Sequence, residues 1–144
     1  MNLSVSAVLI YSLIGAVFLV YLPYGVVGYA RVKLAGQMSD RLEMFRRPRA
    51  TVDLLPDYAQ RANWAHQNAF EALAVYGVAC LSALVTGVDS PWAKIAAIAF
   101  LVARTLYPLF YILNIPVLRS MMFAVGNIAN ITLFALSAIA VQSL

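Results

Sequence analysis

The sequence contains few charged side chains. Only 11% of its 144 residues are Asp, Glu, Lys or Arg, whereas an ordinary soluble domain carries about 25%. Apolar residues make up 63% of the chain, and its mean hydropathy is +0.83. A soluble all-helical protein would lack the polar surface it needs, so the composition excludes that class and indicates a membrane protein.

Cysteine and histidine are almost absent. Cys80 is the one cysteine, so no disulfide can form within the chain, and the single histidine has no cluster of possible metal ligands around it. The sequence also has no glycine-rich phosphate loop and no nucleophile elbow. We therefore expect no metal site. The formal net charge of +4 is no nucleic-acid signal, because most basic residues lie in one loop, where they contact the headgroups of membrane lipids.

Long apolar runs dominate what the sequence does contain. A spanning helix needs about 20 residues, so the chain has room for four spans and one sizeable loop. We predict a single all-α domain, an integral membrane four-helix bundle. The expected spans are residues 3–30, 58–86, 92–113 and 116–142, and the expected loop is 31–57. Ser90 and Pro91 are the predicted N-cap and first residue of the third helix.

The distribution of basic residues predicts the orientation. The long loop carries four arginines, at positions 41, 46, 47 and 49, and Arg119 follows the turn between the last two spans. The positive-inside rule places this loop and the 114–118 turn in the cytoplasm and both termini on the other side. The loop itself has two interpretations, a solvated basic loop at the headgroups or a lid over an anionic site.

Three of the predicted spans carry polar residues at similar depth. Counted from the cytoplasmic side, Asn68 and Glu71 lie roughly 15–20 Å into the second span, Arg104 roughly 13 Å into the third, and Asn127 and Asn130 roughly 16–21 Å into the fourth. Charges inside a membrane are costly unless they are paired. We therefore predict that Arg104 pairs with Glu71 and that the asparagines complete the hydrogen bonds. Such a layer is either a structural clamp or a ligand site.

Nearer the surface, Tyr107 and Tyr111 share a helix face with Arg104, because the three positions are related as i, i+3 and i+7. Tyrosines near a membrane interface are commonly anchors. Here they share a face with a charge, which favours a role in lining a site.

Three segments of the chain resemble the MAPEG family, the membrane-associated proteins of eicosanoid and glutathione metabolism. Ala65-His-Gln-Asn68-Ala-Phe-Glu71 resembles the family's second-helix pattern Ala-His-x-Asn-x-x-Glu. Arg104-Thr-Leu-Tyr107-Pro-Leu-Phe-Tyr111 resembles its third-helix pattern, and Arg119-Ser120 resembles the start of its fourth helix. Order, spacing and the four-span length agree, so the resemblance covers essentially the whole chain.

The resemblance implies a homotrimer that holds glutathione between subunits, near the cytoplasmic face. Arg104 would support Glu71, and Lys33 or Arg31 would reach in from the first helix. The positions that would line the tripeptide site are Asn68, Glu71, Tyr107, Tyr111, Arg119 and Ser120. Glutathione has two carboxylates, which suit basic side chains, and an ammonium group, which suits Glu71.

The implied activity is a glutathione-dependent transferase or peroxidase that acts on a lipophilic electrophile dissolved in the lipid. Arg119, with a hydroxyl donor from Ser120 or Tyr111, would stabilise the thiolate. The expected location is a bacterial inner membrane. One departure matters, since several family enzymes have an arginine where this chain has Gln67. Two alternatives therefore stay open, a non-catalytic member that binds a lipid or thiol, and a purely structural membrane trimer.

Overall fold

The computed structural model describes residues 3–143, which are almost entirely helical. The four long helices are α1 (Val5–Ala35), α3 (Asp57–Val85), α4 (Pro91–Ile112) and α5 (Pro116–Ala140). Short segments are α2 (Glu43–Arg46) and the 3₁₀ turns η1 (Val52–Leu54) and η2 (Val141–Ser143). No β-strand occurs between residues 3 and 143. The predicted all-α class is confirmed, and each long helix is long and apolar enough to cross a membrane.

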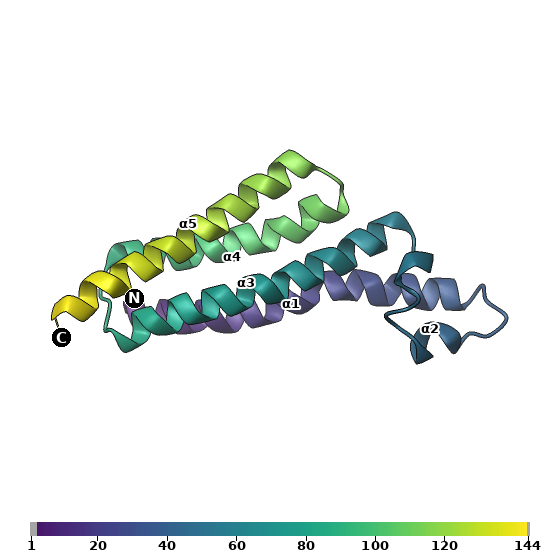
Figure 1. Ribbon diagram of the computed structural model, residues 1–144, viewed down its shortest axis with the longest axis horizontal. Coiled ribbons are helices and arrows are strands. Elements are labelled where there is room, and N and C mark those ends of the chain that lie inside the picture. Colours follow the sequence, from purple (N-terminus) through teal and green to yellow (C-terminus); the bar gives the residue numbers. More distant parts are fainter. Residues whose placement is uncertain (1–2, 144) are drawn as a thin grey trace.

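The long helices form two hairpins, α1 with α3 and α4 with α5 (Figure 1). Both described ends of the chain and the α3–α4 turn lie at one end of the bundle, while the long loop and the α4–α5 turn lie at the other. α3 and α4 also pack on each other, α3 contacts α5, and α1 contacts α4. Over the described residues α1 and α5 make no contact, so α3 and α4 form the middle of the bundle.

Short turns separate α3, α4 and α5. Gly87 ends α3 with a φ of 66°, a left-handed conformation that glycine adopts at little cost. Ser90 caps α4 as predicted, since its Oγ accepts a hydrogen bond from the backbone N–H of Trp92 at 3.3 Å, and Pro91 is the first helical residue. Asn114 ends α4 with a φ of 57°, and asparagine is the residue other than glycine that tolerates this conformation best.

Small residues line the places where α3 and α4 approach their neighbours. The fully buried positions of the two helices are mostly alanines, which allow close helix packing in membranes. Two larger side chains join the hairpins, because the Tyr76 ring stacks on Phe100 with centroids 3.7 Å apart. The Tyr76 hydroxyl also shares a hydrogen bond with the Ser12 hydroxyl, which donates to the Leu9 carbonyl at 2.7 Å.

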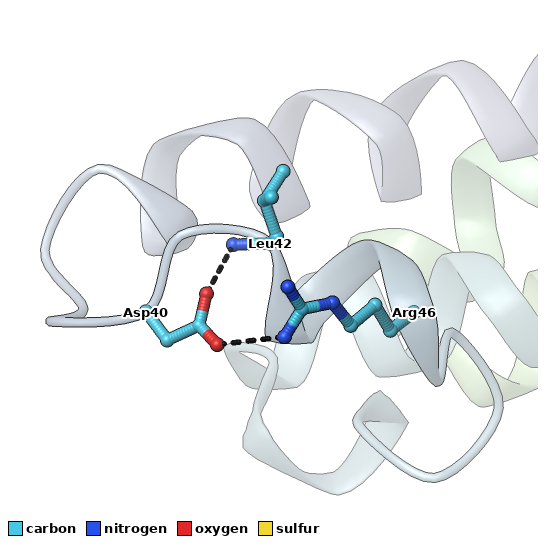
Figure 2. Close-up of polar contacts among 3 residues, drawn as sticks. All are labelled: Asp40, Leu42 and Arg46. Carbon is cyan, nitrogen blue, oxygen red and sulfur yellow. Dashed lines mark hydrogen bonds and ion pairs between the residues drawn. The ribbon is translucent and has the colours of Figure 1, made fainter.

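The segment between α1 and α3 folds back onto the bundle. Met44 and Leu55 are buried within a cluster that includes Val27 and Ala59. At the far edge of the loop, the two carboxylate oxygens of Asp40 accept from the Leu42 backbone N–H and from Arg46 Nη1, each at 3.0 Å (Figure 2). Both partners of this ion pair are more than half exposed, so it adds little stability. The buried residues hold the loop in place.

Candidate functional site

Arg104 is at the centre of the polar layer inside the bundle. Its side chain is only 9% exposed. Its Nη2 donates to the backbone carbonyl of Asn68 at 3.2 Å and to the Asn68 side-chain oxygen at 3.0 Å. The Asn68 amide in turn donates to a carboxylate oxygen of Glu71 at 3.3 Å. The layer therefore joins α4 to α3 through the amide of Asn68.

The direct ion pair that the sequence predicts between Arg104 and Glu71 is not formed. Within residues 3–143, only Asp40 and Arg46 approach within the 4.0 Å of a salt bridge. The helix geometry explains the difference. Asn68 faces α4, whereas Glu71, three residues later on α3, has an exposed side chain. The carboxylate is thus left available at the surface of the bundle.

A series of rings and guanidinium groups runs from Arg104 towards the α4–α5 turn. The Arg104 Cζ lies 4.9 Å from the centroid of the Tyr107 ring. Tyr107 and Tyr111 meet edge to face with centroids 5.6 Å apart. The Arg119 Cζ lies 4.5 Å from the Tyr111 centroid. Each cation is placed where the quadrupole of an aromatic ring stabilises it. The predicted grouping of these four residues is therefore present in the structure.

Two other predicted site residues lie elsewhere on the chain. Ser120 is exposed and lines a shallow groove of α5 together with Pro116 and Met121. Lys33 is exposed and lines a different groove with Tyr58. In the part of the chain that the structure describes, neither side chain lines the cleft that contains Asn68, Glu71 and Arg104.

Asn127 and Asn130 line a cleft between α3, α4 and α5, with a volume of about 170 Å³. Asn68, Glu71 and Arg104 form part of the same cleft. The common depth predicted from the sequence thus corresponds to one shared space. The asparagines of α5 make no hydrogen bond to Arg104 within the described chain.

A second and larger cavity, of about 780 Å³, lies between α1, the long loop and α3. Its most buried charge is Arg31, which is 7% exposed. Arg31 donates to the Tyr24 hydroxyl at 3.2 Å and to the Pro48 carbonyl at 2.6 Å, and its Nε has no partner among residues 3–143. Arg49 and Gln67 also line the cavity, and no carboxylate does.

An uncompensated buried guanidinium favours an anion nearby. The sequence analysis gave Arg31 only as an alternative to Lys33. The burial of a basic residue at the end of a helix depends on how the following loop folds, and the sequence does not show this. Of the two residues, Arg31 is buried and lines this cavity, whereas Lys33 is exposed and lines another groove.

His66 lines this second cavity and helps to pack α3 on α1. Its Nδ1 donates to the backbone carbonyl of Val20 at 2.7 Å, which fixes the tautomer with the proton on Nδ1. The rings of Tyr21, Tyr24 and Phe70 surround the imidazole, with centroids between 4.7 and 6.0 Å away. His66 is therefore a hydrogen-bonded packing residue.

The sequence profile of the MAPEG family matches residues 8–139, nearly the whole chain. The chain belongs to the MAPEG family. No curated protein and no solved structure matches it. As a MAPEG protein with four apolar helices, it is an integral membrane protein of a family that includes glutathione transferases and peroxidases.

Proposed function

We propose that this MAPEG protein is a glutathione-dependent transferase or peroxidase that acts on electrophiles dissolved in the membrane. The observation that carries the proposal is the continuous series from Arg119 through Tyr111 and Tyr107 to Arg104, which then continues through Asn68 to Glu71. The series provides the Arg119 guanidinium and the tyrosine hydroxyl groups at the end near the α4–α5 turn. It provides the Glu71 carboxylate at the opposite end.

The outer end of the series suits a thiolate. A free thiol titrates near a pKa of about 8.5, so only a small fraction is ionised at neutral pH. The Arg119 guanidinium lies over the Tyr111 ring, with its Cζ 4.5 Å from the ring centroid, and it would stabilise the sulfur anion together with the Tyr111 hydroxyl. Ser120, the exposed residue directly after Arg119, is the less favoured hydroxyl donor, because it lines a different groove.

Either reaction then balances with glutathione as co-substrate. In transfer, the thiolate sulfur forms a bond to the electrophilic carbon, and the leaving group departs with its electron pair. In peroxide reduction, the thiolate attacks the outer oxygen and an alcohol leaves. A second glutathione then reduces the sulfenic acid and gives glutathione disulfide and water. Both reactions require the thiol and the lipophilic substrate to meet at the end of the bundle that carries Arg119.

The rest of the tripeptide suits two different faces of α3. Glu71 is exposed on one face and would bind the ammonium group. Gln67 lies on the other face, in the cavity of Arg31 and Arg49, which would bind a carboxylate. We propose that the two faces meet between neighbouring copies in a homotrimer, so that each site is completed by a second chain. In this arrangement Arg31, rather than Lys33, is the contribution of α1.

Binding and turnover test the proposal separately. Protein in lipid nanodiscs is titrated with glutathione and with S-methylglutathione, and product formation is followed with an activated aryl chloride and with a lipid hydroperoxide. We expect saturable glutathione binding and at least one of the two activities. Arg119→Ala should lower turnover at least tenfold while the protein stays folded. Arg41→Ala, in the exposed loop, is the matched control. A wild-type protein that binds no glutathione would disprove the proposal.

A second function is favoured by Gln67, which is neutral where several family enzymes have an arginine. It is a non-catalytic membrane protein that binds a lipid or an anionic thiol in the cavity of Arg31. In that case glutathione or an anionic phospholipid binds, and no product forms with either substrate. Arg31→Met would then abolish binding, whereas Arg119→Ala would leave it unchanged.

A further inference from the structure

A groove beside Lys33 lies apart from the residues of the thiol site proposed above. Arg31 and Lys33 are two residues apart, so at about 100° per residue they lie on opposite sides of α1. Arg31 lines the large cavity, whereas Lys33 lines a groove of about 360 Å³ between the end of α1 and the start of α3. Small-molecule sites have volumes of about 300–1,000 Å³. This groove is therefore large enough for a ligand of its own, whether or not glutathione binds elsewhere.

The polar side chains of this groove can all donate hydrogen bonds, and none of them is a carboxylate. They belong to Lys33, Gln37 and Tyr58, and Leu34 forms part of the apolar floor. Their ammonium, amide and hydroxyl groups make no side-chain hydrogen bond or ion pair within residues 3–143. A cation with two neutral donors beside it suits a ligand that is rich in negatively charged oxygen atoms.

The wall of the groove that the η1 turn supplies is held in place by the fold. The Gln60 side-chain amide donates to the Leu55 carbonyl at 2.8 Å, and the Leu55 side chain is buried in the core that the loop shares with α1 and α3. Leu54 and Pro56, on either side of Leu55, line the groove. The groove is therefore formed before a ligand binds, and binding needs little further ordering of the loop.

The groove lies at the level of the lipid headgroups. Ile112, the last residue of α4, packs against the same buried cluster as Leu34 and Tyr58. The 22 residues of α4 are about 33 Å long, close to the hydrocarbon thickness of a bilayer. The end of α4 therefore marks the boundary of the hydrocarbon, and Lys33 lies at that boundary, within reach of phosphate groups.

From Lys33 towards the bilayer centre, α1 has a stripe of exposed apolar side chains. Tyr29, Leu22 and Phe18 lie on the same helix face as Lys33, and each of them is more than half exposed. Phe18 is about 22 Å from Lys33 along the helix axis, farther than the thickness of one hydrocarbon leaflet, about 15 Å. We propose that the groove binds the phosphate group of an anionic phospholipid, whose acyl chain lies along this stripe of α1.

Lipids with the same chains and different headgroup charges test the proposal. The full-length protein in detergent micelles is titrated with dioleoyl phosphatidylglycerol and with dioleoyl phosphatidylcholine. Native mass spectrometry counts the bound lipids and the copies in each assembly. The first lipid per chain should bind roughly five- to tenfold more tightly when it is the anionic one, the effect of one basic residue at its headgroup. Lys33→Gln should abolish this preference. Arg41→Gln removes a charge from the same end of the protein and should keep it.

A second variant separates a defined contact from a general attraction of charges. Tyr58→Phe keeps the ring that packs on the buried cluster and removes only the hydroxyl. Both lipids carry a phosphate, so this variant should weaken both by a similar factor, roughly two- to tenfold. Glycerol phosphate, which lacks acyl chains, should not displace the lipid at equal concentration.

Four outcomes would overturn the inference. Equal affinity of the wild type for the two lipids would remove its basis. An unchanged preference in Lys33→Gln would place the lipid in the cavity of Arg31 instead. Equal competition by glycerol phosphate would mean that a soluble phosphate is the ligand. Loss of a copy from the assembly in Lys33→Gln would mean that a second chain covers the groove.

Discussion

Asn68 is the residue on which the buried layer depends. Its side chain accepts from Arg104 and donates to Glu71, so one amide links a buried cation to an exposed carboxylate. A neutral amide suits this position, because its oxygen accepts a hydrogen bond while its NH₂ group donates one. Arg104 is thus stabilised by dipoles and by aromatic rings rather than by direct contact with a counter-charge.

Asn68→Ala should therefore be the most destabilising substitution in the layer. It removes the side-chain acceptor of a charged donor that is 9% exposed, and we expect the free energy of unfolding to fall by about 1–3 kcal/mol. Glu71→Gln should cost less than about 1 kcal/mol, since a glutamine oxygen can still accept from Asn68. Reversible unfolding in mixed micelles measures both. A larger loss for Glu71→Gln than for Asn68→Ala would show that the carboxylate is the main partner of Arg104.

The hydrogen bond between Ser12 and Tyr76 should show coupling. Each single substitution, Ser12→Ala or Tyr76→Phe, leaves the other hydroxyl without that partner in the core between α1 and α3. The loss of unfolding free energy in the double variant should be smaller than the sum of the two single losses by about 0.5–1.5 kcal/mol. A double-mutant cycle in the unfolding free energies measures the difference. Strict additivity would mean that the two hydroxyls do not interact in the membrane.

At the residue scale, the sequence predicted which polar groups share a depth and missed how they pair. A rise of 1.5 Å per residue fixes axial position, and Asn68, Arg104 and Asn130 do line one cleft. Pairing depends on helix rotation and side-chain torsions, which hydropathy does not encode. The placement of Ser120 and Lys33 in other grooves has the same origin.

Among the helices, α3 supplies a cation that stabilises the end of α4. Arg61 Nε donates to the carbonyl of Ile112 at 3.0 Å, where the last turn of α4 has carbonyls without helical partners. The positive charge also complements the negative end of the helix dipole. This contact ties the two hairpins together beside the α4–α5 turn.

Arg61→Ala should lower the unfolding free energy by about 0.5–2 kcal/mol through loss of this cap. Arg61→Lys should recover part of the loss, because it keeps the charge. Arg41→Ala removes an exposed arginine from the loop and serves as the control. Hydrogen exchange of the backbone amides at the end of α4 would localise the effect. Unchanged exchange there would argue against the capping role.

The helices themselves were predictable, because apolar runs of sufficient length leave few alternatives in a membrane protein. The end of α1 was not. The charges of Arg31 and Lys33 suggested an end near residue 30, yet α1 continues to Ala35. Tyr24 and Pro48 accept hydrogen bonds from two of the three guanidinium nitrogens of Arg31, so the helix can run past this residue. The packing of the loop could not be predicted from the sequence either. Met44 and Leu55 are isolated apolar residues, and the sequence does not show which residues of the helices they contact.

For the molecule as a whole, the described ends of the chain and the long loop lie at opposite ends of the bundle (Figure 1). We expect the loop to face the cytoplasm. Single cysteines at position 41 and at position 142, in a Cys80→Ala background, should react with a membrane-impermeant maleimide from opposite sides. The residue-142 thiol should be labelled in intact cells and the residue-41 thiol only after the cells are opened. Labelling of residue 41 in intact cells would reverse the orientation.

The assembled state is the second expectation at this scale. Glu71 and Asn127 are exposed on a single chain, although both lie within helices that can span a membrane. Covering them with protein is more favourable than leaving them in lipid. Native mass spectrometry from nanodiscs should therefore find a homotrimer, and Asn127→Leu should alter the assembly less than Glu71→Arg. A stable monomer at all concentrations would rule out a site shared between copies.

The long helices differ in length, and this difference affects how molecules from water and from the lipid reach the protein. α1 has 31 residues and is about 46 Å long, whereas α4 has 22 residues and is about 33 Å long, close to the hydrocarbon thickness of a bilayer. Figure 1 shows α1 and α3 extending past the α4–α5 turn. In a bilayer that matches the length of α4, the loop end of the molecule would therefore form a step, with the ends of α1 and α3 in water and the α4–α5 turn at the level of the lipid headgroups. A water-soluble molecule and an oil-soluble one can both reach that step without either of them leaving its own solvent.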